Sequence, residues 1–367
     1  MRRKLLAFVA AGVMATATMT ACDDSSGASN SSNVSGGNGK AKIGVILPDT
    51  KTSQRWTADD PKYLKQAFAA VGVPVEIQNA QGNKDKFVEI GKSMIDNGAK
   101  ILLIASLDSA SGKAVIDKAH AENVKVIDYD RLTVNGGADY YVSFDNERVG
   151  ELMGRGLVDC LSDKGAVDPV VAELNGAPTD NNATLFKNGY DFVLQNYYDN
   201  TTYMKGPDQW VTGWDDAEAG KIFAQMFQQQ PKIRGVLAAN DGIAAAVIDV
   251  LKQHGLNGKV PVTGQDATVE GLRNLLTGDQ CITVYKMIKP EAQAAANLAG
   301  KLFKGDQPIV PDQIKDPESG ALIPYVSLLP QPITAHNIGD VLADGFVSKE
   351  QLCTGAYAAL CETHNIK

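Results

Sequence analysis

Short apolar runs rich in β-branched residues alternate with longer amphipathic segments along most of the chain. In the first half we predict strands at 42–47, 75–78, 101–104 and 126–129, with helices near 61–71, 84–97 and 111–122. After a helix that begins near Asn146, we predict strands at 170–174, 235–239, 261–264 and 281–285, with helices near 183–195, 216–229 and 242–254. Strands that are apolar on both faces and separated by helices are typical of parallel sheets covered on both sides. The pattern therefore predicts an α/β fold with two similar doubly wound lobes.

The first 40 residues depart from this pattern. Three cationic residues precede an apolar run that ends at Cys22, so residues 1–21 are predicted to be a secretory signal peptide. Met19-Thr20-Ala21-Cys22 resembles the bacterial lipobox, in which the cysteine is lipidated and begins the mature chain; an ordinary signal peptide before a chance cysteine is the alternative. Residues 22–40 have almost no apolar side chains and are predicted to form a flexible tether. The protein is therefore expected to be secreted and lipid-anchored to the outer face of the cell membrane.

The charge balance and the missing motifs exclude several classes of protein. The formal net charge is −8, and removal of the three cationic residues of the signal peptide makes it −11, which disfavours nucleic acid as a partner. No GxGxxG motif follows the first strand, and no GxxxxGK[ST] motif occurs. The four histidines are widely separated, so neither a metal site nor a cofactor is expected. No feature signals oligomerisation, and we expect a monomer.

The cysteine count is compatible with a disulfide-bonded secreted protein. Five cysteines are present, and four remain if Cys22 is lipidated. An even number in an oxidising compartment permits two disulfides. Cys353–Cys361 would staple the C-terminus, and Cys160–Cys281 would be a long-range bridge; four free buried thiols are the alternative.

Planar polar side chains with paired hydrogen-bonding groups follow many of the predicted strands. They occur in Gln54-Arg55-Trp56, Asp128-Tyr129-Asp130-Arg131, Asn175-Gly176, Asp180-Asn181-Asn182, Asn240-Asp241, Gln265-Asp266 and Tyr285-Lys286. Ligands of doubly wound sheets bind beyond the carboxyl ends of the strands. Carboxylates, amides and guanidinium groups can each engage two adjacent sugar hydroxyls. Trp56 and Trp214 are candidates to cover the apolar faces of a pyranose, with Trp210 as a third.

Each of these residues also has a purely structural interpretation. The tryptophans can be core residues, Arg131 can pair with a neighbouring aspartate at the surface, and Lys286 can be an exposed lysine. Four polar residues can cap helices: Asp180, Asn182, Asn240 and Asp266. For Asp241 we favour a structural role as a cap or turn residue. A fold that brings the strand ends together nevertheless makes one site from these separate signals.

The order of the motifs resembles that of periplasmic D-xylose-binding proteins and related multiple-sugar-binding proteins, from about residue 41 to 350. The resemblance is carried by Arg55-Trp56, Tyr129-Asp130-Arg131, Ser143-Phe144-Asp145-Asn146-Glu147-Arg148-Val149-Gly150, Asp180-Asn181-Asn182-Ala183, Asp208-Gln209-Trp210 with Gly213-Trp214, Asn240-Asp241, Gly264-Gln265-Asp266-Ala267 and Thr283-Val284-Tyr285-Lys286. It implies a type I periplasmic binding protein fold with a three-crossover hinge. The N-terminal lobe would comprise 41–145 plus about 286–325, and the C-terminal lobe 146–285 plus about 326–367.

The resemblance also implies the ligand-binding residues, position by position. They are Arg55, Trp56, Arg131, Asp180, Asn182, Trp214, Asn240, Asp266 and Lys286. Gln54 stands where the family often has glutamate, which bears on sugar preference. The tail that contains Cys353 and Cys361 has no counterpart in the family pattern and is expected to act on stability.

We therefore expect an aldose-binding protein that closes two lobes on one monosaccharide and delivers it to an ABC permease and its ATPase. The resemblance favours xylose, with glucose, galactose or arabinose as alternatives. Presentation of the bound sugar to a membrane sensor kinase is a second possible role. A glycoside hydrolase would need a carboxylate pair such as Asp180 and Asp266, but the neighbouring Arg131 and Lys286 would keep both ionised. The chain is not expected to be an enzyme.

Overall fold

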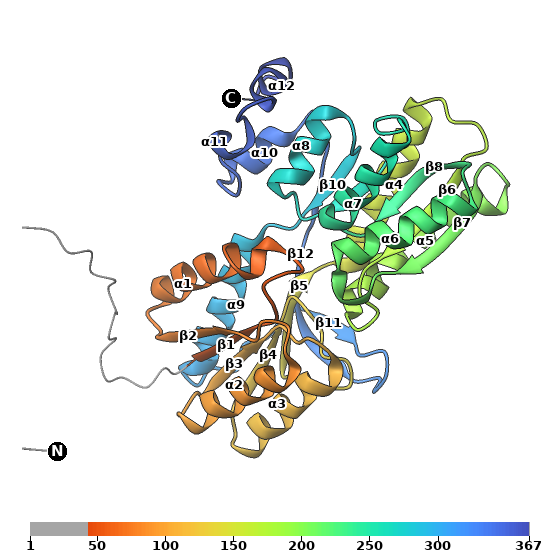
Figure 1. Ribbon diagram of the computed structural model, residues 1–367. Coiled ribbons are helices and arrows are strands. Elements are labelled where there is room, and N and C mark those ends of the chain that lie inside the picture. The colour runs from red at the N-terminus through yellow and green to blue at the C-terminus, as the bar shows by residue number, and fades with distance from the viewer. Residues whose placement is uncertain (1–42, 367) are drawn as a thin grey trace, which may run out of the picture. The chain divides into compact units, whose positions relative to one another are not determined.

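The computed structural model describes residues 43–366 and contains a seven-stranded sheet built largely from the first third of the chain (Figure 1). Its strands are β1 (Ile43–Leu47), β2 (Val75–Asn79), β3 (Ile101–Ile104), β4 (Lys125–Tyr129), β5 (Tyr140–Phe144), β11 (Asp312–Lys315) and β12 (Leu322–Leu328). The order is β11-β12-β5-β4-β3-β1-β2, and only the β11–β12 pair is antiparallel. Every residue of β1 and β3 is buried, as expected for strands covered on both faces.

Helices cover both faces of this first sheet. On one face, α1 (Asp59–Val71) and α9 (Ile288–Phe303) share an apolar core with β1 and β3. On the other face, α2 (Lys84–Asp96) and α3 (Ser109–Ala121) pack against the alternate residues of the same strands (Figure 1). The late position of α9 in the chain shows that the first lobe is completed by residues that follow most of the second lobe.

The second lobe contains two three-stranded sheets joined by a bridge between Val236 and Val262. The strands are β6 (Val170–Asn175), β7 (Met204–Trp210), β8 (Ile233–Ala238), β9 (Thr263–Gln265), β10 (Ile282–Tyr285) and β13 (Gln331–Ile333), in the orders β7-β6-β8 and β13-β10-β9. The helices are α4 (Asn146–Asp163), α5 (Asn181–Asp199), α6 (Asp216–Gln229), α7 (Asp241–Gln253) and α8 (Val269–Thr277). These elements confirm the predicted α/β fold with two doubly wound lobes.

The chain crosses between the two lobes three times. The crossings follow β5, β10 and β12, and the backbone N–H of Asp145 in the first crossing donates to the carbonyl of Leu328, the last residue of β12, at 2.9 Å. Because β12 continues to Leu328, the third crossing falls at 329–330 and not near residue 325. The predicted signal peptide, the tether and the lipidation site Cys22 lie outside the described residues. Within 43–366, no helix combines the length and apolar character that a bilayer crossing requires.

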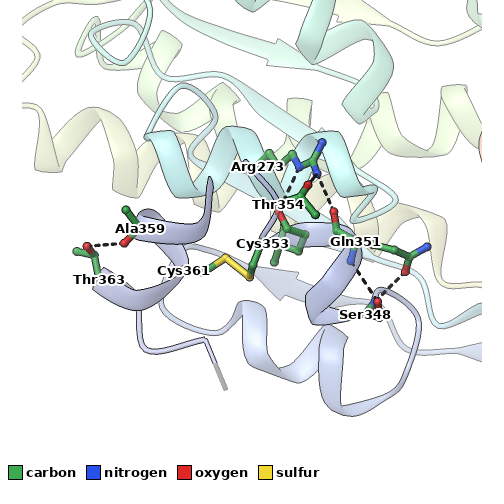
Figure 2. Close-up of a disulfide and its surroundings, with 9 residues drawn as sticks. Arg273, Ser348, Gln351, Cys353, Thr354, Ala359, Cys361 and Thr363 are labelled. Atoms are coloured by element: carbon green, nitrogen blue, oxygen red, sulfur yellow. Dashed lines mark hydrogen bonds between the residues drawn. A yellow bond between two sulfur atoms is a disulfide. The ribbon is translucent and has the colours of Figure 1, made fainter. Parts of the chain in front are cut away.

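A helical tail follows β13 and packs against α8. It consists of α10 (Ile338–Ala343), α11 (Lys349–Leu352) and α12 (Tyr357–Thr363), and the Cys353–Cys361 disulfide joins α12 to the end of α11 (Figure 2). Arg273 of α8 holds the tail, because its Nη2 donates to the carbonyl of Gln351 at 2.7 Å and to the hydroxyl of Thr354 at 2.8 Å. The second disulfide, Cys160–Cys281, ties α4 to the residue before β10. Both predicted pairings are present.

The long-range disulfide is expected to contribute more stability than the one in the tail. The bonded cysteines are 121 residues apart in Cys160–Cys281 and 8 apart in Cys353–Cys361. Because the entropy of closing a loop grows with its length, replacing the first pair by alanines should lower the free energy of unfolding by about 5 kcal/mol, and replacing the second by about 2.5 kcal/mol. Urea unfolding of the two double variants measures the difference, and equal losses would contradict it.

Candidate functional site

A small cavity lies where the strand ends of the two lobes meet. All nine residues predicted to bind a ligand line it: Arg55, Trp56, Arg131, Asp180, Asn182, Trp214, Asn240, Asp266 and Lys286. Five further residues complete the lining: Thr52, Ser53, Asp130, Phe186 and Gln265. Sequence reasoning noted Asp130 and Gln265 in strand-end motifs without assigning them to the site. It gave no signal for Phe186, whose apolar position within α5 is typical of a core residue.

Arg55 occupies the short 3-10 helix Gln54–Trp56 after β1 and is surrounded by three carboxylates. Its Nε and Nη2 donate to Asp60 at 2.8 and 2.9 Å, Nη2 also donates to Glu291 at 2.7 Å, and Nη1 donates to Asp130. A guanidinium has five N–H donors, so these four bonds leave one for a ligand. Arg55 therefore acts mainly by fixing the wall of the cavity.

The carboxylates around Arg55 do not all ionise with ordinary pKa values. Burial, with the charges of Asp130 and Asp60, raises the pKa of Glu291 to about 8, although Arg55 lowers it. Arg55 and Lys286 lower the pKa of Asp130 against the effect of burial. The single charge of Arg55 is shared among three buried carboxyl groups, and Glu291 therefore keeps its proton at neutral pH.

The raised pKa of Glu291 has a consequence for stability. A carboxyl whose pKa is higher in the folded than in the unfolded protein stabilises the fold below its unfolded pKa, and this contribution is lost as pH rises through the folded value. We therefore expect Glu291→Gln to gain stability relative to the parent protein as pH rises from about 5 to 8. Urea midpoints across that range measure this difference. A gain that is constant with pH, or that shrinks, would contradict the assignment.

Arg131 and Asp180 form an ion pair across the two lobes. Arg131 follows β4, Asp180 precedes α5, and Nε of Arg131 lies 3.1 Å from Oδ2 of Asp180. The same carboxylate accepts from the indole N–H of Trp214 at 3.2 Å, and its Oδ1 caps α5 by accepting from the backbone N–H of Asn182 at 3.0 Å. Asp180 is thus both a helix cap and a cavity residue. Arg131 is buried, which excludes the surface-cation interpretation.

Asn182 links the lobes through its side-chain amide and does not cap a helix. Its Nδ2 donates to the backbone carbonyl of Asp130 at 2.9 Å. Its Oδ1 accepts from Asn146 at 3.0 Å and from the hydroxyl of Tyr141 at 3.2 Å. Because these partners use both ends of the amide, Asn182 positions the site as well as lining it.

Asn240, Asp266 and Lys286 present groups with spare hydrogen-bonding capacity. Oδ1 of Asn240 caps α7 by accepting from the N–H of Ile243 at 2.8 Å, and no described residue accepts from Nδ2. Nζ of Lys286 lies 3.9 Å from Asp266 and 3.5 Å from Asp130. Burial raises the pKa of Asp266, and Lys286 opposes this shift. Thr268, not Asp266, caps α8.

Asp241 makes structural contacts, although it is the first residue of α7 and the cap of that helix is Asn240. Its carboxylate lies behind the strand ends, where it accepts hydrogen bonds from Gln280 and Thr283, each at 2.8 Å, and from the backbone and hydroxyl of Thr268. It does not line the cavity, and neither does Trp210, which is partly buried against the core of the second lobe.

Aromatic residues from both lobes face the cavity. Trp56 also belongs to the core of the first lobe, and its ring lies 4.3 Å from the Arg55 guanidinium and 5.3 Å from that of Arg131. In the second lobe, Phe186 and Trp214 make an edge contact with their ring centroids 6.4 Å apart. A side chain at Gly176 would overlap the Trp214 ring, so the glycine after β6 gives the indole its place.

Three cavity residues have left-handed backbone conformations that are unusual outside glycine. The φ angles are 62° for Asp130, 56° for Trp214 and 99° for Asp266. Such conformations cost of order 1–3 kcal/mol each and cluster at functional sites. Here they turn the chain sharply at three strand or loop ends and direct carboxylates and an indole into one space.

The arrangement suits binding of a small polyhydroxylated molecule. Buried carboxylates, amides and cations supply donors and acceptors, and indole and phenyl rings supply flat apolar surface. The pair expected of a hydrolase is poorly placed for acid catalysis, because both oxygens of Asp180 already accept N–H groups.

This chain is similar to known proteins in both sequence and fold. The profile of the family described as periplasmic binding protein domain matches residues 43–307. The D-xylose-binding periplasmic protein of Escherichia coli is 34% identical over 319 residues, which cover 85% of this chain and 93% of that protein. The multiple sugar-binding periplasmic receptor ChvE of Rhizobium radiobacter is 32% identical over 83% of this chain and 90% of its own length. An ABC transporter solute-binding protein from Clostridium phytofermentans, solved with β-D-glucose, superposes with a TM-score of 0.77 at 27% identity, covering 84% of this chain and 99% of that one.

Proposed function

Because this chain belongs to the periplasmic binding protein family, we propose that it is the sugar-binding component of an ABC importer. It is a solute-binding protein and not an enzyme. In this proposal the cavity takes up one aldose, with xylose preferred over glucose, galactose and arabinose. The two lobes close on the sugar, and the closed form delivers it to a permease and its ATPase.

The observation that carries the proposal is the unused hydrogen-bonding capacity of the buried strand-end residues. Asp266, Asn240 and Lys286 line one cavity, and among the described residues their side chains make few polar contacts: the cap bond of Asn240, and the contacts of Lys286 Nζ with Asp130 at 3.5 Å and with Asp266 at 3.9 Å. Buried polar groups without partners cost free energy, so a ligand rich in hydroxyls is the chemistry that satisfies them. Trp56, Trp214 and Phe186 add the flat apolar surface that a pyranose ring requires.

The same groups set the expected affinity. Hydrogen bonds to charged groups contribute about 1.5–3 kcal/mol each, and several of them, less the cost of ordering and desolvation, give a dissociation constant that is micromolar or lower. The preference for xylose is supported by the names of two relatives and by the order of the motifs. It depends on the space around C5, where a hexose carries an additional CH2OH group.

Calorimetry with xylose, glucose, galactose, arabinose and ribose tests the proposal. We expect one binding site per chain and the tightest binding for xylose. Tighter binding of another aldose in the series would correct the preference and leave the sugar-binding function in place. An absence of binding to all five would contradict the function itself.

We also propose that Cys22 carries a lipid that holds the protein at the outer face of the membrane. The support is the Met19-Thr20-Ala21-Cys22 motif and the polar composition of the residues that follow. Cells that express the full chain should retain it in the membrane fraction and incorporate labelled fatty acid. Cys22→Ala should abolish the label and release the protein. A labelled or membrane-retained alanine variant would contradict the anchor.

A further inference from the structure

Gln265 lines the cavity, but it is not among the nine ligand-binding residues that the family resemblance implies. It is the last residue of β9 and is 3% exposed. Its Oε1 is buried, and no described residue donates a hydrogen bond to it. The backbone of Gln265 pairs normally with Val284 of β10, so only the side-chain amide is left without a role.

Buried amide oxygens almost always have a hydrogen-bond partner, and leaving one without a partner costs about 1–3 kcal/mol. The side chain of Gln265 lies beside Asn240, Asp266 and Lys286 in the lining of the same cavity. The cavity is therefore the direction from which a partner for the Gln265 amide can come.

On the proposed sugar-binding function, we infer that Gln265 is a further ligand-contacting residue, whose side-chain amide hydrogen-bonds one hydroxyl group of the bound aldose. A glutamine amide suits this role because rotation by half a turn exchanges Oε1 for Nε2 at the same place. The residue can therefore serve a hydroxyl as acceptor or as donor.

Gln280 provides a matched control in the same lobe. It is also a buried glutamine whose Oε1 has no partner among the described residues. Its Nε2, however, donates to Asp241 at 2.8 Å and to the carbonyl of Ile282 at 3.1 Å, and it does not line the cavity. Comparison of Gln265→Met with Gln280→Met separates loss of a ligand contact from loss of a buried amide.

The test combines these variants with deoxy derivatives of the aldose that the parent protein binds most tightly. Gln265→Met should weaken binding of the parent sugar about 10-fold, the effect of one lost hydrogen bond in a buried site. Its unfolding midpoint should be unchanged or higher, because a buried amide without a partner has been removed. Gln280→Met should lower the unfolding midpoint and change the affinity less than about 2-fold.

The deoxy sugars show whether the contact is direct. The parent protein should bind one deoxy derivative about 10-fold more weakly than the complete sugar, whereas Gln265→Met should bind that derivative and the complete sugar with the same affinity. On every other derivative, the two proteins should lose affinity by the same factor. The inference would be overturned if Gln265→Met bound the complete sugar as tightly as the parent protein does. It would also be overturned if the two proteins lost the same affinity on every deoxy derivative. If the parent protein bound no aldose at all, the sugar-binding function itself would have failed.

Discussion

Asp266→Asn is expected to weaken aldose binding at least about 100-fold, a loss of about 2.7 kcal/mol. The Asp266 carboxylate faces the cavity, and its nearest cationic partner, Nζ of Lys286, is 3.9 Å away. Both oxygens are thus free to accept sugar hydroxyls, and a charged acceptor makes the stronger kind of hydrogen bond. Asparagine tolerates the left-handed backbone at this position, so the substitution tests charge and not folding. Calorimetry measures the affinity.

Asp241→Asn is the control for this prediction, because the Asp241 carboxylate is buried but turned toward protein groups and does not line the cavity. It accepts hydrogen bonds from Gln280, Thr283 and Thr268. An amide there presents a donor to other donors, so the free energy of unfolding should fall by about 1–3 kcal/mol while affinity changes less than about 3-fold. Asp266→Asn should leave unfolding unchanged or slightly favour the fold. The opposite pattern, with binding lost at Asp241 and retained at Asp266, would contradict the assignment of the two carboxylates.

Arg55→Met is expected to lower the free energy of unfolding by about 3–5 kcal/mol. The guanidinium hydrogen-bonds Asp60, Asp130 and Glu291, all of them buried. Removing the cation leaves several carboxyl groups without their partner, and breaking a buried ion pair on one side has about this cost. Urea unfolding measures the change. Sugar affinity should fall as well, because Asp130 and Trp56 lose their support.

Arg148→Met is the matched control for Arg55. Arg148 pairs with Glu151 three residues away on α4, and its side chain is 42% exposed. Exposed ion pairs contribute little, so this variant should change stability by less than about 0.5 kcal/mol. A loss below about 1 kcal/mol in Arg55→Met would show that the carboxyl groups accommodate its absence by protonation.

The sequence predicted the inner strands and the composition of the cavity better than it predicted the edges of the sheets. β1 and β3 are continuous apolar runs, and β6 and β8 are mostly apolar. Parallel strands bring their carboxyl ends to one edge, which is why the predicted residues meet. β7, by contrast, contains Gly206 and Pro207 and three polar residues, and it has no apolar run to signal a strand. It forms because it is an edge strand that pairs only with β6.

The sequence could not predict which cavity residues bond to other protein groups and which remain available to a ligand. Arg55 was expected to bind a ligand, but its carboxylate partners include Glu291, which is 236 residues away along the chain. Asn182 was interpreted as a ligand contact or a cap, yet its amide is used by Asp130, Asn146 and Tyr141. Such assignments depend on long-range packing. A pattern of residue types shows which hydrogen-bonding groups are present, but not which of them already have partners within the folded protein.

A crystal structure of the protein with the aldose that binds most tightly is the most direct test of the central claim. The account predicts one sugar in the cavity at the strand ends, with hydroxyls bonded to Asp266, Asn240 and Lys286 and the ring against Trp56 or Trp214. A sugar bound elsewhere on the protein, with this cavity holding only solvent, would contradict it.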